Sequence, residues 1–226
     1  MKKCIIIATV MLLLLCAVSE AVLIWDQVYG GTASEGGRDV IEAIDGGFVI
    51  VGFTYSEGNG NSDVYLVKTD TQGNQIWTQT YGGSGWEFGY SLCAAEDGSG
   101  YVIAGYTTSS GNGLRDVFLV GTDIAGNQLW TQTYGGADLD EASSIITGHE
   151  GGYVVCGYTC SYGAGEDDIY VIGTDNGGNY IWSAVLGTEK SEMGKTIRKT
   201  GDGNYIIAGS TGLYDTPGVN SGKSRE

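Results

Sequence analysis

Four tryptophans return along this chain at an almost constant interval, and a longer motif returns with them. Trp25, Trp77, Trp130 and Trp182 are spaced 52, 53 and 52 residues apart. The motif Q-[IL]-W-T-Q-T-Y-G-G covers Gln75 to Gly83 and again Gln128 to Gly136, with weaker copies at 24–31 and 181–187. A repeat of this length indicates one supersecondary unit used several times, either as the blades of a propeller or as the turns of a solenoid.

Each unit is predicted to contain four short strands joined by glycine-rich turns. In the clearest copy the strands are expected at 88–96, 100–107, 116–123 and 127–134. These runs are rich in Val, Ile, Tyr and Thr, and they are bounded by turn residues, which is typical of strands. Asp123 to Asn127 forms a compact hairpin connection in which a glycine can adopt a left-handed backbone. The unit shows no helical period.

The fourth strand differs from the second and third in its pattern of polarity. Trp77, Gln79 and Tyr81 share one face of it, and Ile76, Thr78 and Thr80 share the other. The second and third strands are apolar on both faces, as expected for a small sheet packed between two neighbours. The fourth strand is therefore predicted to be an outer edge whose aromatic side packs on the next unit. Four antiparallel strands per unit, repeated radially, predict an all-β fold of β-propeller-type blades of about 52 residues.

The repeat phasing predicts the organisation of the whole chain. After a signal peptide at 1–21, propeller repeats are expected over 22–211, followed by an irregular tail at 212–226. The repeats divide into a lone strand at 22–30, blades at about 36–82, 88–135 and 141–187, and a partial blade at 192–211, fifteen strands in all. No Asp-Val-Tyr-Leu-like run follows Thr211, so a closed four-blade ring would lack one strand.

We therefore expect an open or incomplete arc of about four blades, or a piece of a larger propeller, and a truncated gene product is a third alternative. The ends of such an arc expose unpaired sheet edges that favour association. They are expected either to associate edge-to-edge with another copy or to be covered by further propeller blades.

The first residues resemble an export signal. Lys2 and Lys3 precede an apolar run at 4–18, and the segment 19–21 offers two small residues suited to cleavage, Ser19 and Ala21. The run is shorter than the roughly 20 residues of a membrane span, so none is expected after signal removal. The predicted location is secreted or cell surface. An uncleaved anchor and a lipoprotein attached through Cys16 are alternatives, the second weakened by the bulky Leu15.

Charge and cysteine content exclude some functions. Cleavage after Ser19 would leave 9 basic and 27 acidic side chains, a net charge of −18, which repels phosphate backbones and argues against nucleic acid as a partner. The remaining cysteines, Cys93, Cys156 and Cys160, are odd in number and lack paired spacing, so no disulfide framework is expected. Cys156 occupies the repeat position of valine and alanine, which predicts a small buried residue.

An acidic residue follows each Gly-Gly turn at a constant distance: Glu35, Glu87, Asp140 and Glu192. One hypothesis is a ring of cation ligands on one rim. Calcium, however, holds its oxygens at about 2.3–2.6 Å, whereas equivalent atoms of adjacent blades would be roughly 8–10 Å apart. The favoured interpretation is that each carboxylate accepts hydrogen bonds from a neighbouring turn.

No residue is predicted to be catalytic, to bind a metal or to hold a cofactor. His149 is the sole histidine and lies in a turn, and no Ser or Cys stands in a nucleophile motif. The loops at 56–62, 109–114 and 161–167 could line a recognition face, but no binding residue is assigned. The alternative to a non-enzymatic module is a carbohydrate-active or other hydrolytic propeller that uses a pair of loop carboxylates.

At these motifs the chain resembles the W-T-x-T-Y-G-G class of β-propeller repeats found in secreted bacterial and archaeal proteins. The layout is also similar to kelch blades, with the strand 101–105, the strand 116–123 and Trp130 in the corresponding places. The second glycine of the kelch doublet is absent, because Tyr106 and Tyr158 stand there. The resemblance implies an extracellular binding or surface-scaffold role toward a protein or glycan, with no shared catalytic residues.

Overall fold

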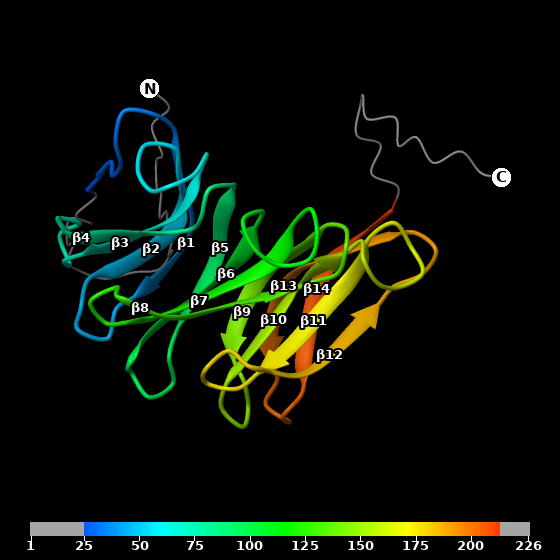
Figure 1. Ribbon diagram of the computed structural model, residues 1–226. Coiled ribbons are helices and arrows are strands. Elements are labelled where there is room, and N and C mark those ends of the chain that lie inside the picture. The colour runs from blue at the N-terminus through cyan, green and yellow to red at the C-terminus, as the bar shows by residue number, and fades with distance from the viewer. Residues whose placement is uncertain (1–24, 213–226) are drawn as a thin grey trace, which may run out of the picture.

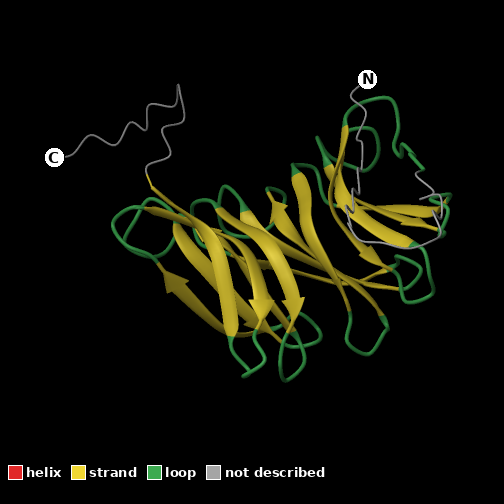
Figure 2. Ribbon diagram, turned by 180° about the vertical axis from the view of Figure 1, so that it is seen from behind, coloured by secondary structure: helices red, strands yellow, loops and turns green. Residues whose placement is uncertain are grey.

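The computed structural model describes residues 25–212, and the regular elements within them are all β-strands (Figures 1 and 2). The first blade contains β1 (Glu35–Glu42), β2 (Phe48–Thr54), β3 (Asp63–Thr69) and β4 (Gln75–Tyr81). The second contains β5 (Glu87–Ala94), β6 (Gly100–Thr107), β7 (Asp116–Asp123) and β8 (Gln128–Tyr134). The third contains β9 (Asp140–Thr147), β10 (Tyr153–Thr159), β11 (Asp168–Thr174) and β12 (Tyr180–Leu186), and a last pair contains β13 (Ser191–Lys199) and β14 (Tyr205–Gly212).

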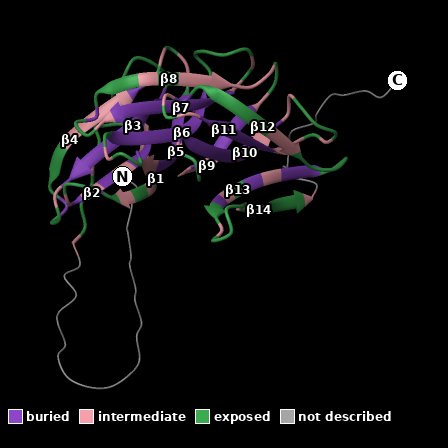
Figure 3. Cartoon of the chain, turned by 90° about the horizontal axis from the view of Figure 1, so that it is seen from below, coloured by how far each residue is buried: buried purple, intermediate pink, exposed green. Residues whose placement is uncertain are grey.

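Each blade is an antiparallel meander, so its strands are hydrogen-bonded in chain order. The sheets follow one another along an arc, with the first blade and the β13–β14 pair at opposite ends (Figure 3). The predicted all-β fold of repeated four-stranded blades in an incomplete arc is confirmed. Gly212, expected to begin the tail, is the last residue of β14; the segments 1–21 and 213–226 lie outside the described residues.

The core consists of apolar layers between consecutive sheets. Val49, Val51 and Leu66 of the first blade pack against Leu92 and Ile103 of the second. The second and third blades, and then the third blade and the last pair, form equivalent layers. Both faces of β3, β6 and β7 are buried for this reason. Each fully buried aliphatic side chain contributes roughly 1.5–3 kcal/mol.

The tryptophan motif connects the outer strands of the first and second blades to the hairpin of the next blade. Trp77 packs on Gly126, where an added Cβ would lie 2.8 Å from the indole. Tyr81 donates a hydrogen bond of 2.6 Å from its hydroxyl to the carbonyl oxygen of Gly126. Gly126 has a φ of 79°, which glycine adopts without strain. The Oδ1 atom of Asp123 closes the same hairpin by accepting the N–H groups of Ala125 and Asn127 at 2.9 and 2.8 Å.

The predicted lone strand at 22–30 is not formed within the described residues, because 25–30 contain no strand. A strand requires a neighbouring edge with which to hydrogen-bond, and no sheet supplies one to this segment. The side chains of this segment nevertheless lie where the side chains of an outer strand lie in the other blades. Trp25 packs on Gly73 and, at a centroid distance of 6.0 Å, on Phe48, and the Tyr29 hydroxyl donates to the Gly73 carbonyl at 2.6 Å. The structure therefore has fourteen strands in residues 25–212 instead of fifteen.

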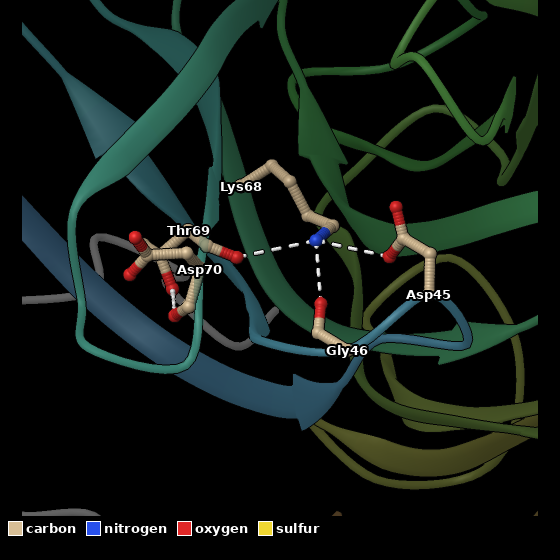
Figure 4. A network of polar contacts seen from close by, with 5 residues as sticks. All are labelled: Asp45, Gly46, Lys68, Thr69 and Asp70. Atoms are coloured by element: carbon tan, nitrogen blue, oxygen red, sulfur yellow. Dashed lines mark hydrogen bonds and ion pairs between the residues drawn. The ribbon is translucent and has the colours of Figure 1, made fainter.

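Lys68 on β3 departs from the repeat, since glycine stands at the equivalent positions 121 and 173 beneath Trp130 and Trp182. Its side chain is buried, and its Nζ atom donates to the carbonyl oxygens of Gly46 at 2.7 Å and Thr69 at 3.1 Å (Figure 4). The same atom forms an ion pair with Asp45 at 3.0 Å. These three contacts compensate the desolvation of a buried ammonium group.

Candidate functional site

The first strand of every blade contains one β-bulge at the same place. The unpaired residues are Arg38, Tyr90, Ser143 and Lys195. A bulge bends its strand and changes the direction in which a side chain points. The residues just before the bulges are small in every unit, whereas the bulged residues are chemically different from one another. The repeat therefore places a variable side chain at one constant position of the scaffold.

Three of the bulged residues line a groove between the inner strands β1, β5, β9 and β13. The groove has a volume of about 570 Å³, which is within the usual range for ligand sites. Its walls include Tyr90 and Ser143 in the middle and Lys195 on the last strand. We call this feature the axial groove. Sequence reasoning missed it, although the variable residue at 38, 90, 143 and 195 is visible once the repeats are aligned.

The charges of the axial groove are separated along the arc. Asp39 and Glu42 line it from β1, and Lys195 and Arg198 line it from β13. Neither of these two cations forms an ion pair with any part of the chain between residues 25 and 212. Their positive charges are thus available to a ligand, in a chain that has only 11 basic residues against 27 acidic ones.

Arg38, the bulged residue of the first blade, lies over two aromatic rings. Its guanidinium carbon is 5.4 Å from the ring centroid of Phe53 and 5.5 Å from that of Tyr90. Cation–π contacts of this kind hold a guanidinium in place while leaving its N–H groups free to donate. Burial, followed by the charge of Glu141, raises the pKa of the Tyr90 hydroxyl, which is therefore protonated at neutral pH.

The acidic residues that follow the Gly-Gly turns are each held by separate hydrogen bonds. Glu87 and Glu192 accept the backbone N–H four residues earlier at 2.8 and 2.9 Å, and Asp140 accepts that of Gly136 at 2.8 Å. Glu35 instead accepts the Thr54 hydroxyl at 3.1 Å. The turn-binding interpretation is confirmed for Glu87, Asp140 and Glu192 but not for Glu35. In the part of the chain described no three potential metal ligands lie together.

Asp140 differs from the three glutamates by one methylene group. Glu87 accepts the Thr107 hydroxyl at 2.7 Å through its Oε1 atom, and Glu192 accepts that of Thr211 at 3.0 Å. The shorter Asp140 does not reach Thr159, which is the corresponding threonine, and its Oδ1 atom is buried without a partner. The third blade therefore contains an orphaned carboxylate oxygen at a position where its neighbours are satisfied.

The three glycine-rich loops at 56–62, 109–114 and 161–167 share one conformation. Gly58, Gly111 and Gly163 have φ values of 105°, 104° and 102°. In each loop, backbone N–H groups bind the first aspartate of the following strand, as Gly113 does with Asp116 at 2.9 Å. The three loops are therefore alike in backbone conformation and in the aspartate that their backbone binds.

The histidine and the cysteines have structural surroundings. The backbone N–H of His149 donates to the Tyr205 hydroxyl at 3.0 Å, and its Nε2 atom lies 3.1 Å from the Asn204 carbonyl, so it joins the third blade to β14. Burial raises the pKa of Cys93 and Cys156 to about 12. Cys156 is completely buried in the last apolar layer, as predicted. A thiol with so high a pKa is a poor nucleophile at neutral pH.

These blades, with their inner groove, define the chain as an all-β repeat protein of the propeller type. No protein-family model matches it. The chain is 31% identical over 161 residues to the regulatory protein FlaEY of Caulobacter vibrioides, an alignment that covers 66% of the chain and 16% of FlaEY.

Two solved structures are also similar to the chain. A protein of unknown function from Bacteroides caccae has a TM-score of 0.47 and 11% identity, over 82% of this chain and 56% of that one. A eukaryotic initiation factor has a TM-score of 0.31 and 9% identity, over 76% and 48%. The chain thus spans about half the length of these structures and about a sixth of FlaEY. Between residues 25 and 212, no helix is long and apolar enough to cross a membrane.

Proposed function

We propose that this chain is an exported, non-enzymatic binding module that takes its ligand in the axial groove. The observation that carries the proposal is the set of four equivalent bulges with four different side chains, of which Tyr90, Ser143 and Lys195 line the groove. A rigid repeated scaffold with variable residues at one constant place is the arrangement by which binding sites are built.

The chemistry of the groove favours a segment of a partner protein over a neutral glycan. Lys195 and Arg198 can bind carboxylates at one end, and Asp39 and Glu42 can attract a cationic side chain at the other. Tyr90 and Ser143 add hydroxyl groups between them, which can donate to and accept from a peptide backbone. The ligand is therefore a polar peptide with an acidic and a basic part.

The proposal also states that the chain is exported and that it is not an enzyme. Export is supported by the positive start, apolar run and small residues at 1–21. The non-enzymatic role is supported by the carboxylates that follow the turns, which are already hydrogen-bonded, and by the protonated thiols. FlaEY is named a regulatory protein; a regulatory role for this chain, exerted through binding a protein segment, is an extension of the proposal.

The test is an array of peptides that vary in charge, probed with the purified chain and two variants. Ser143→Trp fills the middle of the groove, and Thr131→Trp adds bulk at an exposed position of the outer strand β8 as a matched control. We expect bound peptides to contain both acidic and basic residues, with affinity lowered at least tenfold by Ser143→Trp alone. Equal binding by all three proteins, or loss with the control only, would contradict the groove as the site.

A further inference from the structure

The two ends of the arc expose the two halves of an interface that the chain already forms three times. On the side that faces the preceding blade, Leu92, Ile145 and Ile197 are 3%, 3% and 0% exposed, but Val40, their equivalent in the first blade, is 45% exposed. On the side that faces the following blade, Val49, Val102 and Val154 are 0–3% exposed, but Ile206, their equivalent on β14, is 61% exposed. Each end lacks the apolar partner that the other end carries.

A polar contact repeats at the same interfaces. Asp39 accepts the backbone N–H of Leu92 at 3.1 Å, Ser91 accepts that of Ile145 at 3.4 Å, and Ser144 accepts that of Ile197 at 3.4 Å. In the last unit, the residue equivalent to the three acceptors is Thr196. In the first blade, the residue equivalent to the three donors is Val40. The Val40 N–H donates instead to the carboxylate of the adjacent Asp39, at 2.9 Å. The donor and the acceptor that would continue the series therefore stand at opposite ends of the arc.

Charge favours the same pairing. The strand β1 carries Glu35, Arg38, Asp39 and Glu42, a net charge of −2. The strand β13 carries Glu192, Lys195, Arg198 and Lys199, a net charge of +2. Opposite potentials on two surfaces promote their encounter and suppress the pairing of like ends.

The shapes of the ends are also compatible. Up to residue 212, where the described structure stops, the last unit contains its two inner strands, β13 and β14. On the first blade the outer part of the exposed face is already covered by Trp25, which packs on Phe48, whereas the inner part around Val40 is open. A half-blade placed there covers the open part and leaves the N-terminal segment in place.

We propose that a second copy of this chain docks head to tail, with β13 and β14 of one copy packed against the first blade of the other as a continuing blade. This goes beyond the proposed groove ligand and does not depend on it. The contact is heterologous, so it closes into a ring if the rotation per copy allows it and otherwise extends into a filament. It is a face-to-face contact of sheets, in contrast to the edge-to-edge association expected from the sequence.

The experiment measures mass by light scattering over a range of concentrations. Wild type is expected to reach at least twice the mass of one chain. Val40→Asp and Ile206→Asp, each at an exposed position, are each expected to stay monomeric. Leu129→Asp on β8 is the control, since Leu129 is 61% exposed but lies on an outer strand, and it is expected to behave as wild type. Circular dichroism and melting temperature establish that all variants are folded.

Mixing the two monomeric variants separates this proposal from its alternatives. Each variant retains one intact end, so an equimolar mixture of Val40→Asp and Ile206→Asp is expected to form a one-to-one complex and nothing larger. A symmetric contact between two β14 strands would leave Val40→Asp dimeric, which would overturn the proposal. A monomeric wild type at every concentration, as when residues 213–226 of the same chain cover Ile206, would overturn it too, as would a mixture that does not associate.

Discussion

The hydroxyl of Tyr29 donates a hydrogen bond of 2.6 Å to the carbonyl oxygen of Gly73, and this is the bond that Tyr81 makes to Gly126 one blade later. Tyr134 repeats it with Gly178. At the first position the bond forms although the segment that contains Tyr29 is not a strand. The aromatic motif therefore attaches a segment to the next blade through side chains alone, independently of a β-ladder.

The contribution of this bond is tested by Tyr81→Phe. The variant keeps the ring but leaves the carbonyl oxygen of Gly126 without its buried donor, and we expect a loss of about 1–3 kcal/mol in the free energy of unfolding. Tyr29→Phe is the matched control, with a smaller loss because its bond is only partly buried. Urea denaturation measures both. Equal stability of wild type and Tyr81→Phe would show that the bond is dispensable.

The orphaned carboxylate of the third blade predicts a stabilising substitution. Asp140→Glu extends the side chain by one methylene group, which allows it to reach the Thr159 hydroxyl as Glu87 reaches Thr107. We expect a gain of about 0.5–1.5 kcal/mol. The reciprocal Glu87→Asp should create the same orphan and lose about 1–3 kcal/mol. Thermal melts of both decide the matter; a lower melting temperature for Asp140→Glu would mean that the site has no room for the longer chain.

The raised pKa of Asp63 predicts how a substitution at this residue changes stability with pH. Burial, and then the charge of Glu87, raise the pKa of its carboxyl above the ordinary 3.8 despite hydrogen bonds from Asn59 and Gly60. Because the folded pKa exceeds the unfolded one, the ionised group destabilises the fold above that folded pKa, and the effect disappears at low pH. Asp63→Asn should therefore raise the urea midpoint at pH 7 and leave it unchanged near pH 3.

Asp70 gives the opposite sign and serves as the control for that measurement. Hydrogen bonds, chiefly from the side chain of Asn74, lower the pKa of the Asp70 carboxyl. Its stabilising effect is present above the unfolded pKa and is lost as pH falls through the folded pKa. Asp70→Asn should lower the urea midpoint at pH 7, and the difference should shrink in acid. If the urea midpoints of Asp63→Asn and Asp70→Asn moved in the same direction at pH 7, the electrostatic explanation would be refuted.

Gly121 is expected to accept no larger residue. A Cβ at this position would lie 2.1 Å from Cε2 of Trp130, so Gly121→Ala must displace the indole. We expect a loss of about 1–3 kcal/mol together with a change in tryptophan fluorescence, as for other overpacked sites. Gly201→Ala is the control, because nothing lies within 4 Å of its Cβ position. Unchanged fluorescence in Gly121→Ala would place Trp130 elsewhere.

The strands could be predicted closely because their pattern is local. The structure places β6 at Gly100–Thr107 and β7 at Asp116–Asp123, which are the residues expected for the second and third strands. Apolar residues on both faces, with a glycine turn at each end, leave little choice of register. The aromatic side of the outer strand was also predicted to pack on the next unit, and Trp77 on Gly126 confirms this.

The rest could not be predicted, because it depends on contacts between distant residues. A bulge at Tyr90 arises from the register of two paired strands, which no pattern within one strand shows. The environment of Lys68 depends on the turn that contains Asp45 and Gly46. The segment at 25–30 has the sequence of an outer strand, but a strand also requires a partner edge, and its sequence cannot supply one.

The contacts of Trp77, Tyr81 and Asp39 each join one blade to the next, and the main packing likewise connects consecutive sheets. In such arrays stability is approximately a sum of unit and nearest-neighbour terms. A tandem duplication of one 52- or 53-residue segment of the gene therefore inserts a blade whose two new interfaces copy existing ones. Growth of the protein by whole units is nearly neutral for folding, and its length is free to change in evolution until ring closure or a partner limits it.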